Sequence, residues 1–473
     1  MAGEELVFSS VTDLARQIKA KRLSPVELTE ACLERMRRLD PKLLAVITLT
    51  EERARSEARQ AEQEIAKGRY RGPLHGIPYG LKDLFDTKGI RTTWGIKYHE
   101  ERIPAEDATV VGKLRDAGAL LLAKLSMGEL ARGARWFGGT TRCPWDTTRS
   151  SGGSSAGPAA ATAAGMVGFA VGTETMGSLI GPTAVCGVSA LRPTYGRVSR
   201  AGAMALGWTI DKVGPICRTV EDCGLVFDAI RGVDPRDPST VEMPYRWDPG
   251  ASPAKLRVGV VEAEFDGLRD ATVKPIMKEA LGAIERLGVT LEPIQLPDYP
   301  YNSVFEVVRG AEAALFFEDL ITDDHVATLS DDAARAWKNT LPAARVIPAV
   351  QYLKAQQIRA LMQADATRLM KTVDVWVAPA GGPAQPAAEG PSRPPASTPA
   401  PARPAGPARP APRTSSFTNL TGLPAVCVPA GYVDGLPVGI QFVGRSFEEA
   451  SVMTLAKAYQ DATGWHTRHP RLD

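Results

Sequence analysis

Apolar and polar positions alternate along this chain in blocks that predict helices and strands in turn. Leu28, Cys32 and Met36 recur on one face of a predicted helix, with Ser24 as its N-cap and Pro25 at its first position. The predicted helices cover residues 11–21, 25–39, 51–67, 108–117, 220–230 and 273–287, and a further helix is predicted to begin over 126–130. The predicted strands cover residues 44–49, 120–124, 256–261, 289–296 and 374–379. This alternation predicts an α/β fold with a central mixed or mostly parallel sheet.

The stretch from residue 150 to 202 stands apart from this pattern. It carries two Gly/Ser clusters, at residues 152–157 and 172–178. Between them, the small residues 158–165 favour a helix that begins with a proline, and the apolar residues 167–171 favour a buried strand. The order is therefore turn, helix, strand, turn, and the chain can fold back to bring the two serine-bearing turns together.

Glycines beside serines have a physical use in such turns. Glycine lets the backbone adopt positive φ angles, so that several N–H groups point into one concavity. Such a concavity stabilises a developing oxyanion, and an adjacent serine can be the nucleophile. Either cluster alone is equally compatible with a tight structural turn.

Several motifs resemble those of the amidase signature family, in the same order and at similar spacing over most of the chain. GGSSAG and GTETMGSLI, at residues 152–157 and 172–180, are similar to the family's GGSSGG and GTDxGGSIR segments. GIPYGLKD at 76–83 resembles its GIPxxxKD segment, and residues 186–197 resemble its CGxxGxKPTxGR continuation. Residues 419–424 and 435–441 resemble its closing motifs.

This resemblance implies an α/β/α domain with helices on both faces of the sheet, and a Ser-Ser-Lys triad. Lys82 takes the place of the base, Ser154 of the bridging serine and Ser178 of the nucleophile. A cis peptide is implied between Gly153 and Ser154. The oxyanion hole is implied at the backbone N–H groups of Thr175, Met176, Gly177 and Ser178, and Met127 resembles a position that lines the acyl pocket.

Three positions depart from the family pattern. Glu174 stands where the family often has Asp, Met176 where it often has Gly, and Ile180 where it often has Arg. Backbone donors do not need those side chains, so the implied triad survives. The flexible apolar side chain of Met176 beside the nucleophile suits an apolar substrate.

Lys82 also has an interpretation that does not depend on the family. Ile77, Leu81, Leu84 and Phe85 surround it in the sequence, which predicts partial burial. Burial lowers the pKa of a lysine toward the neutral amine that a base must be. Most lysines are solvated surface charges, so this position is unusual.

Composition limits the class of protein. The net charge of +2 over 473 residues gives no electrostatic case for binding nucleic acid or a membrane. Six scattered cysteines without a CxxC pair fit reduced thiols, and neither a signal pattern nor an apolar run of membrane-spanning length is present. We therefore expect a cytoplasmic protein that needs no metal or cofactor.

The chain is expected to form one domain over residues 1–473, with an N-terminal helical segment over 1–70 packed on it. A proline-rich stretch over 381–411 cannot build a regular element and predicts an inserted loop. A monomer or homodimer is expected.

The predicted function is hydrolysis of the C–N bond of carboxamides, with aryl or hydrophobic amides favoured and carbamates (urethanes) or esters possible by the same acyl-transfer chemistry. Three alternatives remain open. One is the A subunit of a glutamine-dependent tRNA amidotransferase, and another is an inactive binding or scaffold protein. The third is an α/β-hydrolase with Ser155 as nucleophile and His466 or His469 as base, although the polar segment 140–151 does not suit the buried strand that such a nucleophile needs.

Overall fold

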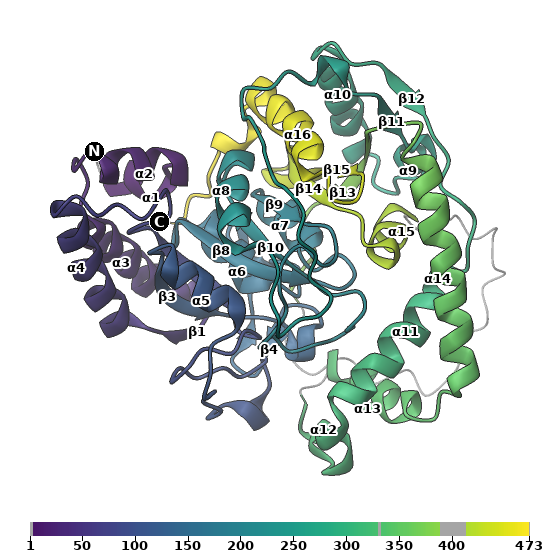
Figure 1. Ribbon diagram of the computed structural model, residues 1–473, viewed down its shortest axis with the longest axis horizontal. Helices are drawn as coiled ribbons and strands as arrows, with labels where there is room; N and C mark the ends of the chain where they lie inside the picture. The colour runs from purple at the N-terminus through teal and green to yellow at the C-terminus, as the bar shows by residue number, and fades with distance from the viewer. Residues whose placement is uncertain (1–2, 330–332, 388–412, 473) are drawn as a thin grey trace.

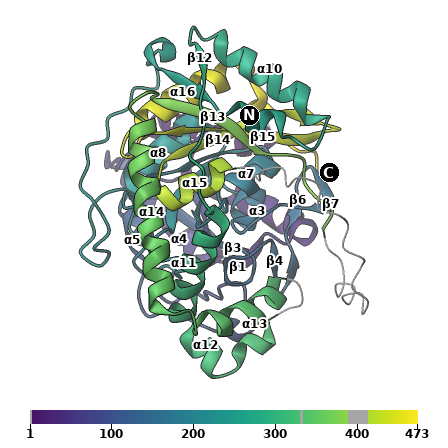
Figure 2. The same ribbon diagram turned by 90° about the vertical axis from the view of Figure 1, so that its right-hand side faces the viewer.

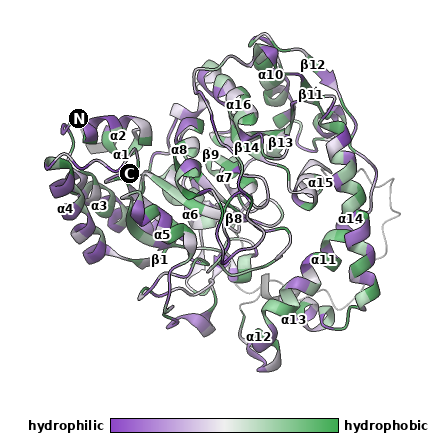
Figure 3. Cartoon of the chain, in the orientation of Figure 1, coloured by the Kyte–Doolittle hydropathy of each residue, from purple (hydrophilic) through white to green (hydrophobic). Residues whose placement is uncertain are grey.

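A computed structural model describes residues 3–329, 333–387 and 413–472 of the chain (Figure 1). The loop predicted over residues 381–411 lies largely outside these residues and stays a prediction. Within the described ranges, none of the helices combines the length and apolar character needed to cross a membrane. The helix predicted over residues 51–67 is present at Glu51–Ala66, and Figure 3 shows it as largely hydrophilic.

An eleven-stranded mixed sheet runs through the described part of the molecule (Figures 1 and 2). In spatial order its strands are β1 (Val46–Leu49), β3 (Leu120–Leu125), β2 (Pro78–Lys82), β8 (Phe169–Glu174), β10 (Lys212–Cys217), β9 (Ser189–Arg192), β14 (Ala425–Val433), β15 (Leu436–Gly444), β13 (Val375–Gly381), β11 (Val258–Val260) and β12 (Leu291–Pro293). Two short hairpins lie outside it, β4 (Arg135–Trp136) with β5 (Gly139–Thr140) and β6 (Arg142–Cys143) with β7 (Asp146–Ser150).

The sheet is mixed, as predicted, but it is not mostly parallel. The neighbours β3, β2 and β8 are parallel, and so are β13, β11 and β12. The strands from β8 through β10, β9, β14 and β15 to β13 pair antiparallel. The reason is local in part, because β14 and β15 form a hairpin across a turn at Asp434 and Gly435, both with positive φ.

Helices cover both faces of the sheet. A Cβ atom added at Gly439 of β15 would meet Ala184, whereas one added at Gly444 would meet Val452. Positions five residues apart on a regular strand face opposite sides, so the helices that carry Ala184 and Val452 lie on opposite faces. The helices are α1 (Gly3–Phe8), α2 (Val11–Lys19), α3 (Pro25–Leu43), α4 (Glu51–Ala66), α5 (Thr109–Asp116), α6 (Ala156–Ala163), α7 (Ile180–Cys186), α8 (Val220–Ile230), α9 (Glu262–Asp266), α10 (Val273–Glu285), α11 (Tyr301–Phe316), α12 (Glu318–Thr322), α13 (Ala333–Ala344), α14 (Ala349–Leu369), α15 (Arg413–Thr421) and α16 (Glu449–Thr463).

All the predicted helices and strands but one are present, with boundaries shifted by a few residues. Ser24 caps α3 through hydrogen bonds from the N–H groups of Val26 (3.0 Å) and Glu27 (3.4 Å), as predicted.

The prediction of a helix beginning over residues 126–130 is wrong. The backbone N–H of Ser126 donates to Ala45 and its carbonyl accepts from Gly157, so tertiary contacts occupy its backbone groups. Leu130 has positive φ, which ends any regular helix there. Only a short 3₁₀ turn, Glu129–Ala131, forms.

Candidate active site

Lys82 is the last residue of β2 and lies inside the parallel part of the sheet. Its neighbour β8 is parallel to it, so Lys82 and Thr173 reach the same edge. The Nζ atom of Lys82 lies 2.9 Å from the Oγ atom of Ser154 and 2.9 Å from the Oγ1 atom of Thr173. Its apolar neighbours predicted partial burial, and Lys82 is fully buried.

The buried position changes the protonation of this lysine. Burial lowers the pKa of Lys82 from 10.5 to about 7, although Asp211 and Glu174 favour the charged form. A large share of the amine is therefore uncharged at neutral pH, and an uncharged amine can accept a proton from a hydroxyl group.

Ser154 lies in the turn between β7 and α6. The peptide bond between Gly153 and Ser154 is cis, as the family resemblance implied. A Cβ atom at Gly153 would lie 1.9 Å from the carbonyl oxygen of Gly133, so only glycine fits there. The packing of this turn leaves the Ser154 hydroxyl buried against Lys82.

Ser155, directly after it, is held by backbone atoms. Its hydroxyl donates to the carbonyl of Thr173 (3.1 Å) and accepts from the N–H of the same residue (3.3 Å). These bonds tie the start of α6 to β8. The hydroxyl of Ser155 is fully buried and engaged by the protein.

Ser178 follows the end of β8, in the turn before α7. Met176, Gly177 and Ser178 are half-buried, whereas the residues on both sides of them are buried. Gly177 has φ of +88°, a conformation that few other residues adopt. The carbonyl of Ser178 accepts a 3.2 Å hydrogen bond from the N–H of Ser155, so the two serine-bearing turns lie side by side, as predicted.

The carboxylate of Glu174 shapes the Ser178 turn from inside. It accepts hydrogen bonds from the backbone N–H groups of Leu179 (2.8 Å) and Ile180 (2.9 Å). It also accepts from the guanidinium of Arg192 (2.6 Å) and from the amide of Asn419 (2.9 Å). Four donors from three parts of the chain thus converge on one buried carboxylate.

Buried charges around Glu174 compensate one another. Burial alone would raise the pKa of Glu174, but Arg192 and Lys212 lower it to about 2. Burial lowers the pKa of Lys212 to about 7, with Arg192 acting in the same direction. In the sequence, Glu174 stood out only as a departure from the family pattern, and this cluster was not predicted.

A second carboxylate, Asp211, was also missed. It accepts from the hydroxyl of Thr175 (2.5 Å), one of the residues predicted to form the oxyanion hole. The available signal was the charged pair Asp211 and Lys212 at the start of the apolar stretch that forms β10. Thr173, which contacts Lys82, gave no signal beyond its place in the motif.

A cavity of about 300 Å³ opens beside these groups. Its lining includes Thr173 and Asp211, and therefore reaches the contacts of Lys82 and of Thr175. Apolar side chains make up much of the remaining wall, among them Met204, Trp208, Leu315 and Phe316. Five charged residues also line it, namely Arg200, Asp211, Arg236, Asp237 and Glu312.

Met127, predicted to line the acyl pocket, lies in the hydrophobic core and is fully buried. It is not among the residues that line this cavity, and neither are Lys82, Ser154 and Ser178, so the role of Met127 in an acyl pocket stays a prediction. Among the described residues, no group of three or more His, Cys, Asp or Glu side chains is placed to hold a metal ion.

The residues of the α/β-hydrolase alternative are not arranged for that chemistry. The strand β7 before the Ser154 turn belongs to a partly exposed hairpin outside the main sheet. His469 stacks on Phe8 with ring centroids 4.0 Å apart. His466 and His469 line another cavity, whose lining does not include Ser155.

Comparison with known proteins assigns the family. The family model named Amidase matches residues 27–453. The chain belongs to the amidase signature family. Members of this family hydrolyse amides, so the chain is an amide hydrolase, and a Ser-Ser-Lys triad is characteristic of the family.

Relatives and solved structures match over nearly the whole chain. The A subunit of glutamyl-tRNA(Gln) amidotransferase from Carboxydothermus hydrogenoformans is 35% identical, over 99% of this chain and 100% of that protein. The peptide amidase from Stenotrophomonas maltophilia has a TM-score of 0.80 at 30% identity, over 98% and 99% of the two chains. A bacterial aryl acylamidase has a TM-score of 0.83 at 25% identity, over 97% and 98%.

Proposed function

We propose that this amidase cleaves uncharged carboxamides with hydrophobic or aryl groups, using Ser178 as nucleophile, Ser154 as proton relay and Lys82 as base. The observation that carries the proposal is the buried contact of Lys82 with Ser154, beside the half-exposed turn of Ser178. The lowered pKa of Lys82 supports its role as a proton acceptor at neutral pH.

In the first step, the Oγ atom of Ser178 forms a bond to the carbonyl carbon of the amide. Its proton passes to Ser154, and the proton of Ser154 passes to Lys82. The negative charge that develops on the carbonyl oxygen is stabilised by backbone N–H groups from the turn of Thr175, Met176, Gly177 and Ser178. Positive φ at Gly177 supports such an arrangement of N–H groups.

The tetrahedral intermediate then breaks its C–N bond. A proton returns from Lys82 through Ser154 to the leaving nitrogen, which departs as a neutral amine. Water attacks the acyl-enzyme along the same relay, so that the acid leaves and Ser178 regains its proton. Each half-reaction takes one proton to Lys82 and returns it.

The charges of the cavity favour an uncharged substrate. Arg200 pairs with Asp237, and Glu312 accepts hydrogen bonds from Thr209. Asp211 is engaged by Thr175. Arg236 donates to Thr109 (2.6 Å), so every charged side chain that lines the cavity has a partner in the protein.

The curated relatives support a second candidate, the A subunit of a glutamine-dependent tRNA amidotransferase, because several of them carry that name at 33–36% identity. Glutamine carries an ammonium and a carboxylate, which need charged partners. The pairing of the cavity charges favours the first candidate, an enzyme that acts without partner subunits.

One experiment separates the two candidates. The purified chain alone is offered an anilide, a primary amide, a carbamate, an ester and glutamine, with Ser178→Ala as the inactive control. Turnover of the anilide without glutaminase activity supports the proposal. Glutaminase activity that dominates over all the other substrates would favour the second candidate.

A further inference from the structure

Trp208 is unusual among the tryptophans of this chain. All eight lie in the described residues, and Trp208 alone is classed as exposed, at 59%. A large aromatic side chain normally buries most of its surface. Trp208 instead lies on the wall of the cavity beside Thr173 and Asp211, which contact the proposed catalytic groups.

Two buried charged side chains hold the turn that carries Trp208, residues 206–211, at Thr209. Glu312 of α11 accepts from the N–H of Thr209 (3.0 Å) and from its hydroxyl (2.7 Å). Arg359 of α14 donates to the carbonyl of Thr209 (2.6 Å) and to its hydroxyl (2.6 Å). Every polar group of Thr209 is therefore fixed by a charged side chain.

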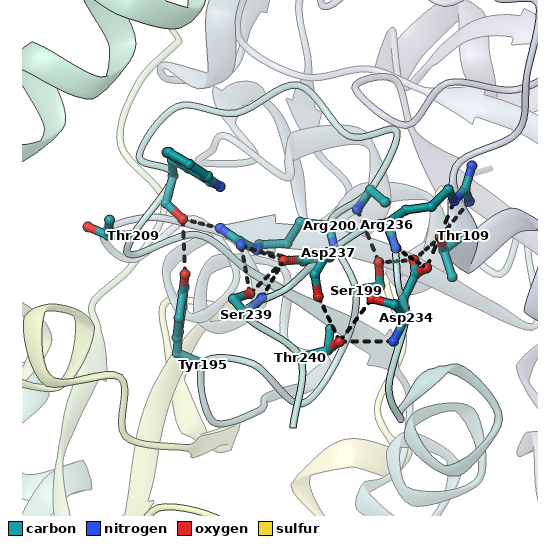
Figure 4. Close-up of polar contacts among 12 residues, drawn as sticks. Thr109, Tyr195, Ser199, Arg200, Thr209, Asp234, Arg236, Asp237, Ser239 and Thr240 are labelled. Atoms are coloured by element: carbon teal, nitrogen blue, oxygen red, sulfur yellow. Dashed lines mark hydrogen bonds and ion pairs between the residues drawn. The ribbon is translucent and has the colours of Figure 1, made fainter. Parts of the chain in front are cut away.

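A second pair of side chains holds the carbonyl of Trp208 itself. Arg200 and the hydroxyl of Tyr195 both donate to this oxygen, and Figure 4 shows them converging beside Thr209. Arg200 is held in turn by Asp237, through bonds of 3.1 and 2.9 Å to its two carboxylate oxygens. The direction of the Trp208 backbone is thus set independently of its indole ring.

Asp211 connects the same turn to the proposed oxyanion hole. Its carboxylate accepts from the N–H groups of Leu206 (2.7 Å) and Gly207 (2.9 Å), and from the hydroxyl of Thr175 (2.5 Å). Trp208 and the Ser178 turn are therefore parts of one hydrogen-bonded unit. The backbone of Trp208 therefore has a defined position relative to the Ser178 turn.

The other walls of the cavity suit a flat ring. Leu315 and Phe316 of α11 are exposed, at 68% and 41%. The small side chains of Ala201, Ala203 and Ala205 line the cavity without filling it. Apolar surface exposed in a concave site is a sign of ligand binding, because a ligand that covers it removes it from water.

We propose that Trp208 is a specificity-determining residue that stacks on an aryl group of the substrate, and that Thr209, Glu312 and Arg359 position it. The proposal rests on the proposed function for the location of the scissile bond. A side chain on a fixed backbone loses less conformational freedom when the substrate binds than one on a mobile loop, so more of the stacking energy contributes to binding. The substrate class is therefore aryl amides, with the ring on the acyl side or on the amine.

The test compares substrates that differ only in the ring. Acetanilide and acetamide share the acyl group, and benzamide and acetamide share the leaving group. Trp208→Ala should lower kcat/KM at least about tenfold for one or both aryl substrates, mainly through KM, and change acetamide less than about twofold. Trp208→Phe should restore most of the loss, because it keeps an aromatic face.

Trp465→Ala is the matched control, because Trp465 lies against Tyr432 and Arg468 near the C-terminus and does not line this cavity. It should change no substrate preference. Thr209→Val tests the positioning, and should raise KM for the aryl substrate without changing acetamide. Equal losses on aryl substrates and acetamide in Trp208→Ala, or no loss on either aryl substrate, would overturn the proposal.

A binding measurement separates this proposal from the proposed function. Ser178→Ala and Ser178→Ala/Trp208→Ala are titrated with acetanilide and benzamide by calorimetry. Weaker binding of an aryl ligand to the double variant, by about tenfold, supports the role of Trp208 even if no amide is turned over. Equal Kd values for the two variants would overturn it even if the enzyme is an active amidase.

Discussion

The carboxylate of Glu174 and the side-chain amide of Asn419 lie 2.9 Å apart, although 245 positions separate them in the chain. Asn419 belongs to α15, and Glu174 ends β8 directly before the Ser178 turn. The same carboxylate binds the N–H groups of Leu179 and Ile180. This contact therefore joins the C-terminal part of the fold to the turn that carries the proposed nucleophile.

We predict that Glu174→Gln destabilises the protein by roughly 3–5 kcal/mol, because it leaves the buried guanidinium of Arg192 without the carboxylate that it pairs with. Urea unfolding at pH 7 measures this, with Glu52→Gln, whose side chain is 89% exposed, as the control. Because the pKa of Glu174 is lower in the folded than in the unfolded protein, its carboxylate stabilises the fold. This contribution is complete above pH 4.5, the ordinary pKa, and is lost as the pH falls toward 2. A Glu174→Gln variant as stable as the control would contradict this.

The different roles of Ser178, the proposed nucleophile, and Ser155, which is held by backbone atoms, give a second prediction. Ser178→Ala should abolish turnover, with a loss of at least about a thousandfold, because it removes the attacking oxygen. Ser155→Ala should keep a large part of the activity and lose roughly 1–3 kcal/mol of stability, since Thr173 loses its hydroxyl partner. Mass spectrometry after fluorophosphonate labelling should locate the adduct on Ser178. An adduct on Ser155 would refute the assignment.

Local sequence predicted part of the surroundings of the candidate site, whereas the roles of Lys82, Ser154 and Ser178 came from the resemblance to the family. The apolar neighbours of Lys82 predicted partial burial, and the order of elements between the two Gly/Ser clusters predicted that their turns can come together. Glycine positions carry such information because their conformation and close packing exclude other residues, as at Gly153. The order of strands and helices likewise followed from periodic apolar positions.

The rest depends on contacts between distant parts of the chain. Glu312 and Arg359 hold Thr209 from positions 103 and 150 residues later, and no local pattern indicates such partners. The residues over 126–130 resemble a helix start, but the backbone of Ser126 bonds to Ala45 and Gly157 instead. The antiparallel centre of the sheet was missed because strand direction depends on which strands become neighbours.

The buried amine of Lys82 gives a third prediction, for stability. Its pKa is lowered to about 7 in the folded protein, so the unfolded chain binds more protons between about pH 7 and 10.5. Lys82 therefore destabilises the fold below this window, and the cost disappears as pH rises through it. Lys82→Met should be inactive yet more stable by roughly 1–3 kcal/mol at pH 7. This gain is the relief of the buried charge, reduced by the loss of the two hydrogen bonds of Lys82 to Ser154 and Thr173.

The measurement is urea unfolding of both proteins at pH 7 and pH 10. The advantage of Lys82→Met should shrink at the higher pH, because most of the pH window between the folded and the unfolded pKa of Lys82 has then been crossed and only the unfolded amine still carries a charge. Lys19→Met, at an exposed lysine of α2, is the control for the substitution itself. An advantage of Lys82→Met that is equal at both pH values would show that the charge of Lys82 is not its source.

The same pKa determines the pH dependence of the reaction. Only the uncharged amine of Lys82 can accept the proton of Ser154, so kcat/KM should rise with pH through one ionisation near 7 and then level off. The ordinary pKa of a lysine would place this rise near 10.4. Lys82→Ala should lower kcat on amides by at least about a thousandfold. The loss should be smaller on activated esters, whose leaving group needs no proton.

Lys82→Arg tests the neutral base most directly, because a guanidinium keeps a positive charge at every pH of the assay. It can still donate a hydrogen bond to Ser154, so a role for Lys82 in orientation or charge alone would leave much of the activity. A base role predicts that Lys82→Arg is as inactive on amides as Lys82→Ala, and that its residual rate no longer rises through pH 7. Amide turnover by Lys82→Arg close to that of the wild type would exclude Lys82 as the base and leave Ser178 without its proton acceptor.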